Sequence, residues 1–254
     1  MSEAVPRAIL LDLDDTILDD SGDTARCWRD ACRAHESELG DQGASALIVA
    51  IERVRRWYWA DAERHRVGRL DLGAARREIV ELALREVRLE CADLAGLDED
   101  AALAALAAKV ADWYGRERER GMSLFDGAID TIRWLRDRGS KLALVTNGNG
   151  AAQRRKVDRF GLAAWFDVIL IEGELGYGKP DERVYRLAME RLDVVPASAW
   201  MVGDNLEWDV AAPQRLGIRG IWIDGRGMGV PPGHAARPDR IIRRLSDLRN
   251  GGVS

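Results

Sequence analysis

The sequence lacks several features that would point to particular classes of protein. Its three cysteines, Cys27, Cys32 and Cys91, have no metal-binding spacing, and an odd number of scattered cysteines fits reduced thiols in a cytoplasm. No apolar run approaches the roughly 20 residues of a membrane-spanning helix, and the N-terminus has no signal-peptide pattern. We therefore expect a cytoplasmic protein with no membrane partner.

An excess of positive charge is also missing. The net charge is -5 at pH 7, which argues against a protein that binds nucleic acid through bulk electrostatics. An anionic substrate is not excluded, because a bound divalent cation and one lysine can hold a phosphate inside an acidic protein. With 254 residues, 46% of them hydrophobic, the chain suffices for one large or two small globular domains.

The chain contains two kinds of sequence. Between residues 19 and 121 proline is absent, and the apolar spacing in 72–87 and 100–114 predicts helices. Beyond residue 125, helices expected at 129–138, 150–160, 181–192 and 208–216 alternate with strands expected at 142–145, 168–171, 200–202 and 221–223. This alternation predicts a doubly wound, parallel-sheet, Rossmann-like α/β core of residues 1–18 and 122–254, with residues 19–121 inserted as an all-helical cap domain.

Two carboxylates follow the first expected strand. Asp12 and Asp14 end an apolar run and would point to the same side of an extended chain. Like charges so placed repel unless a cation or a proton lies between them, and ligands of open α/β sheets bind outside the carboxyl ends of the strands. The pair therefore predicts a metal-dependent or acid/base site.

The later strands also end in polar residues. Thr-Asn-Gly at 146–148 ends the second strand, Lys179 follows the third in a glycine-rich loop, and Asp204 ends the fourth, with Asp209 five residues beyond. In a doubly wound sheet these residues can converge on one crevice. Carboxylates are ligands for hard cations such as Mg²⁺, and a carboxylate can attack phosphorus to form an aspartyl phosphate.

Each motif alone has an ordinary structural interpretation. D-x-D-x-T and T-N-G are common in turns, a single lysine is usually solvated, and Asp209 could simply lie near a helix N-terminus. Four motifs in order, each after an expected strand, favour a functional site.

These four ordered motifs resemble those of the haloacid dehalogenase superfamily over the whole core, and the insertion resembles the helical cap of its subfamily I. The resemblance implies that Asp12 is the nucleophile and a Mg²⁺ ligand. Asp14 would be the general acid/base, with its backbone carbonyl on the metal. The remaining implied roles are phosphate binding for Thr146, Asn147 and the catalytic Lys179, Mg²⁺ binding for Asp204, and support for Asp209 and Thr16. Gln153 and Lys156 look like residues of members that hydrolyse nucleotide or acylated amino-sugar phosphates.

We therefore expect a Mg²⁺-dependent phosphomonoesterase that hydrolyses a small phosphorylated metabolite, such as a nucleotide or a sugar phosphate, through an aspartyl phosphate. Three alternatives stay open: a 2-haloacid dehalogenase, a phosphomutase and a non-catalytic binding protein on this fold. Dehalogenases of the superfamily lack the acid/base residue, so Asp14 argues against the first. Mutases often carry Val where Thr16 stands, and a binding protein would be expected to have lost a motif residue. A monomer and a homodimer are both compatible with the sequence.

The most unusual composition of the expected cap surrounds Trp57, Trp59 and Arg66. The two tryptophans are too close in sequence to share a helix face. Either one packs in the cap core while the arginines are solvated, or these side chains face the active site and select the leaving group.

Overall fold

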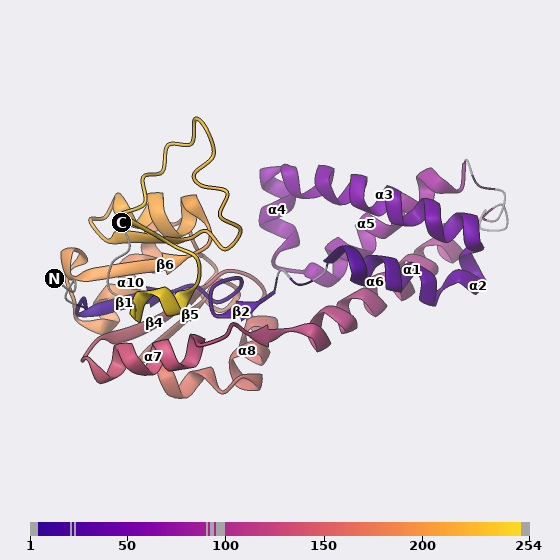
Figure 1. The fold of residues 1–254 in the computed structure, drawn as a ribbon. Helices are drawn as coiled ribbons and strands as arrows, with labels where there is room; N and C mark the ends of the chain where they lie inside the picture. Colours follow the sequence, from indigo (N-terminus) through magenta and orange to yellow (C-terminus); the bar gives the residue numbers. More distant parts are fainter. Residues whose placement is uncertain are drawn as a thin grey trace. The chain divides into compact units, whose positions relative to one another are not determined.

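The computed structural model describes residues 5–20, 22, 24–89, 91, 94 and 100–249. Contacts within the chain divide it into two compact units. Met1–Asp20 and Ser123–Ser254 form the first unit, and Ser21–Met122 forms the second. Figure 1 shows that the first unit contains the sheet and that the described part of the second is helical.

A six-stranded sheet forms the centre of the first unit (Figure 1). Its order is β5-β4-β1-β6-β7-β8, and each neighbouring pair is parallel. All four residues of β1 are buried, as expected of a central strand that is covered on both faces. The predicted α/β class is thereby confirmed. The strands are β1 (Ala8–Leu11), β4 (Lys141–Thr146), β5 (Val168–Ile171), β6 (Ala199–Gly203), β7 (Arg219–Ile223) and β8 (Arg240–Ile242).

The strand order places the carboxyl end of β1 between two others. Leu11 pairs with Leu144 of β4 on one side and with Val202 of β6 on the other. The chain adds β4 and β5 on one side of β1, then crosses to add β6, β7 and β8 on the other. The direction of winding therefore reverses between β1 and β6, which is where open α/β sheets bind ligands.

Helices of the first unit connect these strands. The α-helices are α7 (Ala128–Asp137), α8 (Gly150–Arg159), α9 (Glu172–Leu175), α10 (Glu182–Leu192) and α11 (Ala212–Gln214). Short 3-10 turns are η2 (Leu162–Trp165), η3 (Pro196–Ser198) and η5 (Leu245–Arg249). Val184, Ala188 and Leu192 lie four apart along α10, so they share one face. That face packs in a cluster with Leu10 and Val145 of the sheet.

Several short elements differ from the sequence prediction. The helix expected at 208–216 begins as a π-helical segment, η4 (Leu206–Ala211), and continues as α11. The edge strand β8 was not predicted, because its three residues include an arginine and a half-exposed isoleucine and give no strand periodicity. The antiparallel pair of β2 (Leu18–Asp19) and β3 (Ser123–Leu124) is also too short to leave a pattern.

The second unit is helical throughout its described residues. Its helices are α1 (Thr24–Ala34), α2 (Glu36–Leu39), α3 (Asp41–Ala60), α4 (Ala62–Gly68), α5 (Leu72–Val87) and α6 (Asp100–Gly121). Asp61 and Asp71 cap α4 and α5 by accepting hydrogen bonds from backbone N–H groups. Trp28 of α1 stacks on Tyr114 of α6 with ring centroids 3.7 Å apart. Within the described residues, the chain has no helix that is both long and apolar enough to span a membrane.

Replacing Leu10 by alanine should lower the free energy of unfolding of the first unit by about 2–5 kcal/mol. The Leu10 side chain is 0% exposed, so its loss leaves a cavity in the cluster that α10 covers. Urea denaturation followed by circular dichroism measures the change. Leu89→Ala makes the same chemical change at a residue that is 82% exposed, and its effect should stay within about 0.5 kcal/mol. Equal losses in both variants would contradict this description of the core.

Candidate active site

A pocket of about 170 Å³ lies at the carboxyl ends of β1, β4 and β6. It lies within the first unit and collects nearly all the residues that the sequence motifs singled out in the core. Thr16, Gln153 and Lys156 do not line the pocket: Thr16 is buried beside Asp12, and the other two lie on α8. The lining residues are Asp12, Asp14, Asp15, Thr146, Asn147, Lys179, Asp204, Asn205, Trp208 and Asp209.

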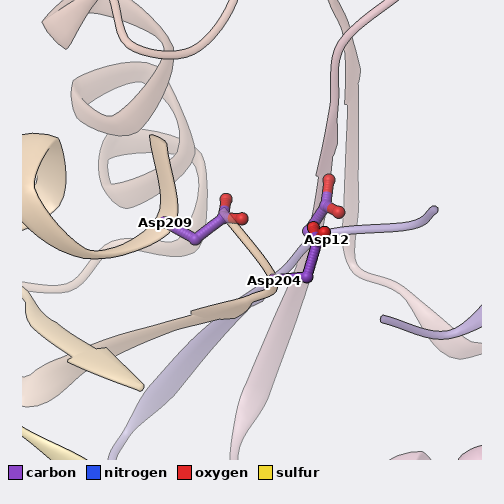
Figure 2. Close-up of side chains that lie close together, drawn as sticks. All are labelled: Asp12, Asp204 and Asp209. Atoms are coloured by element: carbon purple, nitrogen blue, oxygen red, sulfur yellow. The ribbon is translucent and has the colours of Figure 1, made fainter. Parts of the chain in front are cut away.

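Three carboxylates meet in this pocket (Figure 2). One oxygen each from Asp12, Asp204 and Asp209 lies within 4.8 Å of the others. Asp12 follows β1, Asp204 follows β6, and Asp209 lies on η4. Gly203 allows this approach, because a Cβ atom there would come within 2.2 Å of Asp209 Oδ2. A residue with a side chain at position 203 would therefore displace the Asp209 carboxylate.

Lys179 is the buried counterion of this cluster. Its Nζ donates to Asp12 Oδ1 and to Asp209 Oδ1, both at 2.7 Å, and the side chain is 1% exposed. Burial by itself would lower the pKa of the ammonium, but the two carboxylates more than offset this, and the pKa of Lys179 is raised. Lys179 is therefore a fixed positive charge at neutral pH.

One ammonium does not neutralise the cluster. Burial raises the pKa of Asp12 to about 7, against the lowering effect of Lys179. Desolvation within the pocket, together with the charges of Asp12 and Asp209, raises the pKa of Asp204 to about 8. Since Asp204 is exposed to solvent, we attribute more of its shift to repulsion between the carboxylates than to burial. Carboxylate oxygens are ligands that hard cations prefer. The raised pKa values of Asp12 and Asp204 indicate that their ionised forms lack sufficient positive charge nearby, which a divalent ion such as Mg²⁺ would supply.

Asp209 is less available to such an ion than its two neighbours. Its Oδ1 accepts from Lys179, and its Oδ2 accepts from the backbone N–H of Asn205 at 3.0 Å. Asn205 in turn caps η4 by accepting from two backbone N–H groups. Asp209 therefore holds Lys179 and the turn after β6 in place, whereas Asp12 Oδ2 accepts a longer hydrogen bond, at 3.4 Å, from the Thr16 hydroxyl.

Asn147 anchors the backbone of Lys179. Its Nδ2 donates to the Lys179 carbonyl at 2.6 Å, and its Oδ1 accepts from the Lys179 N–H at 2.8 Å. The side chain thus links the carboxyl end of β4 to the loop after α9, and its contact with phosphate stays a prediction. Gly178 leaves room for this link, because a Cβ atom there would lie 2.5 Å from Asn147 Oδ1.

Asp12 and Asp14 have different partners. The strand ends at Leu11, and Asp15 adopts a left-handed backbone (φ 57) that turns the chain. The Thr16 hydroxyl donates to Asp12 Oδ2 at 3.4 Å, whereas Asp14 accepts from Gln153 Nε2 at 2.8 Å and from Lys156 Nζ at 2.7 Å. The chain therefore turns only after Asp14, and both carboxylates line the pocket while they accept from different donors.

The predicted cap residues have distinct surroundings in the second unit. Trp59 packs against the helical core and meets the His65 ring edge-on. Trp57 is 53% exposed, with the Arg64 guanidinium 3.8 Å from its ring centre. Arg66 is exposed and pairs with Glu63. Their role in choosing a substrate stays a prediction.

Comparison with known proteins gives consistent results. A family model for haloacid dehalogenase-like hydrolases matches residues 6–217. The chain is 34% identical to a phosphoserine phosphatase of Thermus thermophilus over 96% of each protein. The solved structure of YfnB, a HAD-hydrolase of Bacillus subtilis, has a TM-score of 0.70 at 24% identity and covers 97% of this chain and 98% of its own. A 2-haloacid dehalogenase of Pseudomonas syringae has a TM-score of 0.61 at 25% identity, with 97% of each chain covered.

Asp204→Asn should stabilise the metal-free protein more at pH 8 than at pH 5. A carboxyl whose pKa is raised by folding favours the folded state at low pH, and this contribution disappears as the pH rises through the folded-state pKa of about 8. Asparagine cannot ionise, so the variant escapes that loss. Urea denaturation in EDTA at both pH values measures the difference. A variant whose relative stability is the same at both pH values would show that folding does not raise this pKa.

Proposed function

The chain belongs to the haloacid dehalogenase-like hydrolases and is a phosphoric monoester hydrolase, and from this premise we propose that it transfers the phosphoryl group of a small metabolite to Asp12. The observation that carries the proposal is the division of the carboxylate pair. Asp12 lies with the Lys179 ammonium, whereas Asp14, two residues later, is held by separate donors on α8. A nucleophile and a proton-transfer group need such different surroundings.

In the first step, an Asp12 oxygen attacks phosphorus and the bond from phosphorus to the ester oxygen breaks. The proton of the Asp14 carboxyl passes to that oxygen, and the alcohol leaves. Lys179 and the Thr146 hydroxyl offset the negative charge on the phosphoryl oxygens. Thr16 orients Asp12 through its hydrogen bond.

In the second step, water attacks phosphorus of the aspartyl phosphate. Asp14 accepts the proton of the water, and the bond from phosphorus to Asp12 breaks, so that inorganic phosphate and both original carboxyl groups are regenerated. Asp14 therefore acts as acid in one step and as base in the other.

Asp12 and Asp204, with the backbone carbonyl of Asp14, would hold the Mg²⁺ ion. When bound, the ion supplies positive charge that compensates Asp12 and the phosphoryl oxygens.

Cys27, Cys32 and Cys91 are free and buried, which supports the predicted cytoplasmic location.

A 2-haloacid dehalogenase is the second candidate, because one of the similar solved structures carries that name. Cleavage of a carbon–halogen bond releases an anion that needs no proton, so a carboxyl at Asp14 would have no task in the first step. Halide release from a 2-haloacid, with no phosphate release from any ester, would favour this alternative.

Asp12→Asn should reduce phosphate release from an aryl phosphate by more than about a thousandfold, because the amide is a poor nucleophile. The substitution keeps the shape of the side chain, so the thermal unfolding temperature should show a folded protein. Asp158→Asn, at an exposed residue of α8, is the matched control and should keep full activity. Turnover by Asp12→Asn near the rate of the parent would exclude this mechanism.

Removal of divalent cations should abolish phosphate release, and Mg²⁺ should restore it. A second readout is the rise in unfolding temperature on adding Mg²⁺, since a ligand of the folded state stabilises it by mass action. The rise should be greater at pH 8 than at pH 6, because the raised pKa values of Asp12 and Asp204 make protons compete with the ion. Asp204→Asn should lose most of the rise; an undiminished rise in that variant would place the metal elsewhere.

A further inference from the structure

Helix α8 presents two polar side chains to the candidate active site. Gln153 and Lys156 are three residues apart, so they lie on one face of the helix. Gln153 is 4% exposed, and the Lys156 side chain is 14% exposed. Val157, on the same face as Gln153, is 0% exposed, as expected of a helix surface that packs on the sheet.

The amide of Gln153 joins two residues of the proposed mechanism. Its Nε2 donates to Asp14 Oδ2 at 2.8 Å and to the Thr146 hydroxyl at 2.6 Å. Both N–H groups of the amide are therefore used, and each fixes a different functional side chain. An apolar residue would suit this buried position better unless the hydrogen bonds have a purpose.

Lys156 completes the environment of Asp14. Its Nζ donates to Asp14 Oδ1 at 2.7 Å and to Asp20 Oδ2 at 3.3 Å. Burial would lower the pKa of Lys156, but these two carboxylates outweigh it and raise the pKa, so the residue stays charged. Each oxygen of Asp14 thus has its own donor, and the plane of the carboxylate is fixed from both sides.

We propose that Gln153 and Lys156 are positioning residues that aim the Asp14 carboxylate for proton transfer, and that Gln153 also fixes the Thr146 hydroxyl. This inference rests on the proposed role of Asp14. Neither residue reacts: both act through Asp14, which exchanges the proton with the leaving oxygen and then with water. A small misplacement of a catalytic group can reduce a rate by about a hundredfold.

The two steps of the reaction separate this role from a merely structural one. An alkyl ester needs the proton from Asp14 in the first step, whereas p-nitrophenolate leaves without it. Every substrate needs Asp14 as base in the second step. A misplaced Asp14 should therefore let the phosphoenzyme form from p-nitrophenyl phosphate and then slow its hydrolysis.

The test is rapid-mixing kinetics with p-nitrophenyl phosphate in Mg²⁺ for Gln153→Leu, Lys156→Met and the double variant. We expect a burst of nitrophenolate close to one equivalent per protein, followed by steady turnover about ten- to a hundredfold below that of the parent. Lys156→Arg keeps the charge and the donors, and should recover much of the turnover lost in Lys156→Met. Arg155→Met removes one positive charge from the exposed side of the same helix and should behave like the parent.

Steady turnover within twofold of the parent in all three variants would overturn the proposal. So would an equal fall in the burst rate and the steady rate of Lys156→Met, because that pattern indicates general damage to the site; Gln153→Leu can also slow the burst, since Gln153 fixes the Thr146 hydroxyl. Gln153→Met, which has almost the same shape, replaces Gln153→Leu if the latter unfolds at a lower temperature. Asp14→Asn tests the proposed function separately. If this variant has the turnover of the parent, Asp14 is not the general acid/base, whatever the α8 variants show.

Discussion

A buried ammonium shared between two buried carboxylates is the constraint on which the rest of the site depends. Lys179 lies between Asp12 and Asp209 and donates to both at 2.7 Å, because a buried charge is costly unless it is paired. Asn147 holds the backbone of Lys179, and Asn205 holds Asp209. Asp204 adds a third carboxyl whose pKa is raised to about 8, and a bound cation would compensate the charge that its ionisation brings.

The same arrangement explains why two carboxylates so close in sequence can do different chemistry. Asp12 accepts from Lys179, whereas Asp14 accepts from Gln153 and Lys156 of α8. One carboxylate is thus embedded with the proposed metal and phosphate ligands, and the other is held by an amide and a lysine. The pair itself does not identify the leaving group.

The α/β class and the position of the site could be predicted because both depend on repetition. Alternating strands and helices imply a parallel sheet, and polar residues at strand ends imply a crevice. Short elements such as β8 and η4 carry too few residues to show a period. The partners of Asp14 were out of reach for another reason: Gln153 lies 139 residues from it in the chain, and only the packing of α8 brings them together. The family resemblance singles out Gln153 and Lys156 but does not place them against Asp14. Asn147 is a motif residue whose side chain also bonds the backbone of Lys179, a contact that the sequence pattern does not reveal.

The covalent role of Asp12 is the central claim, and trapping the intermediate tests it most directly. The protein would be mixed with an aryl phosphate in Mg²⁺, quenched in acid within the first turnover, digested and examined by mass spectrometry. We predict one phosphoryl group, on the peptide that contains Asp12 and at that residue, and none on this peptide in Asp12→Asn. A phosphoryl group on another residue, or full turnover with no covalent phosphate at any quench time, would contradict the account.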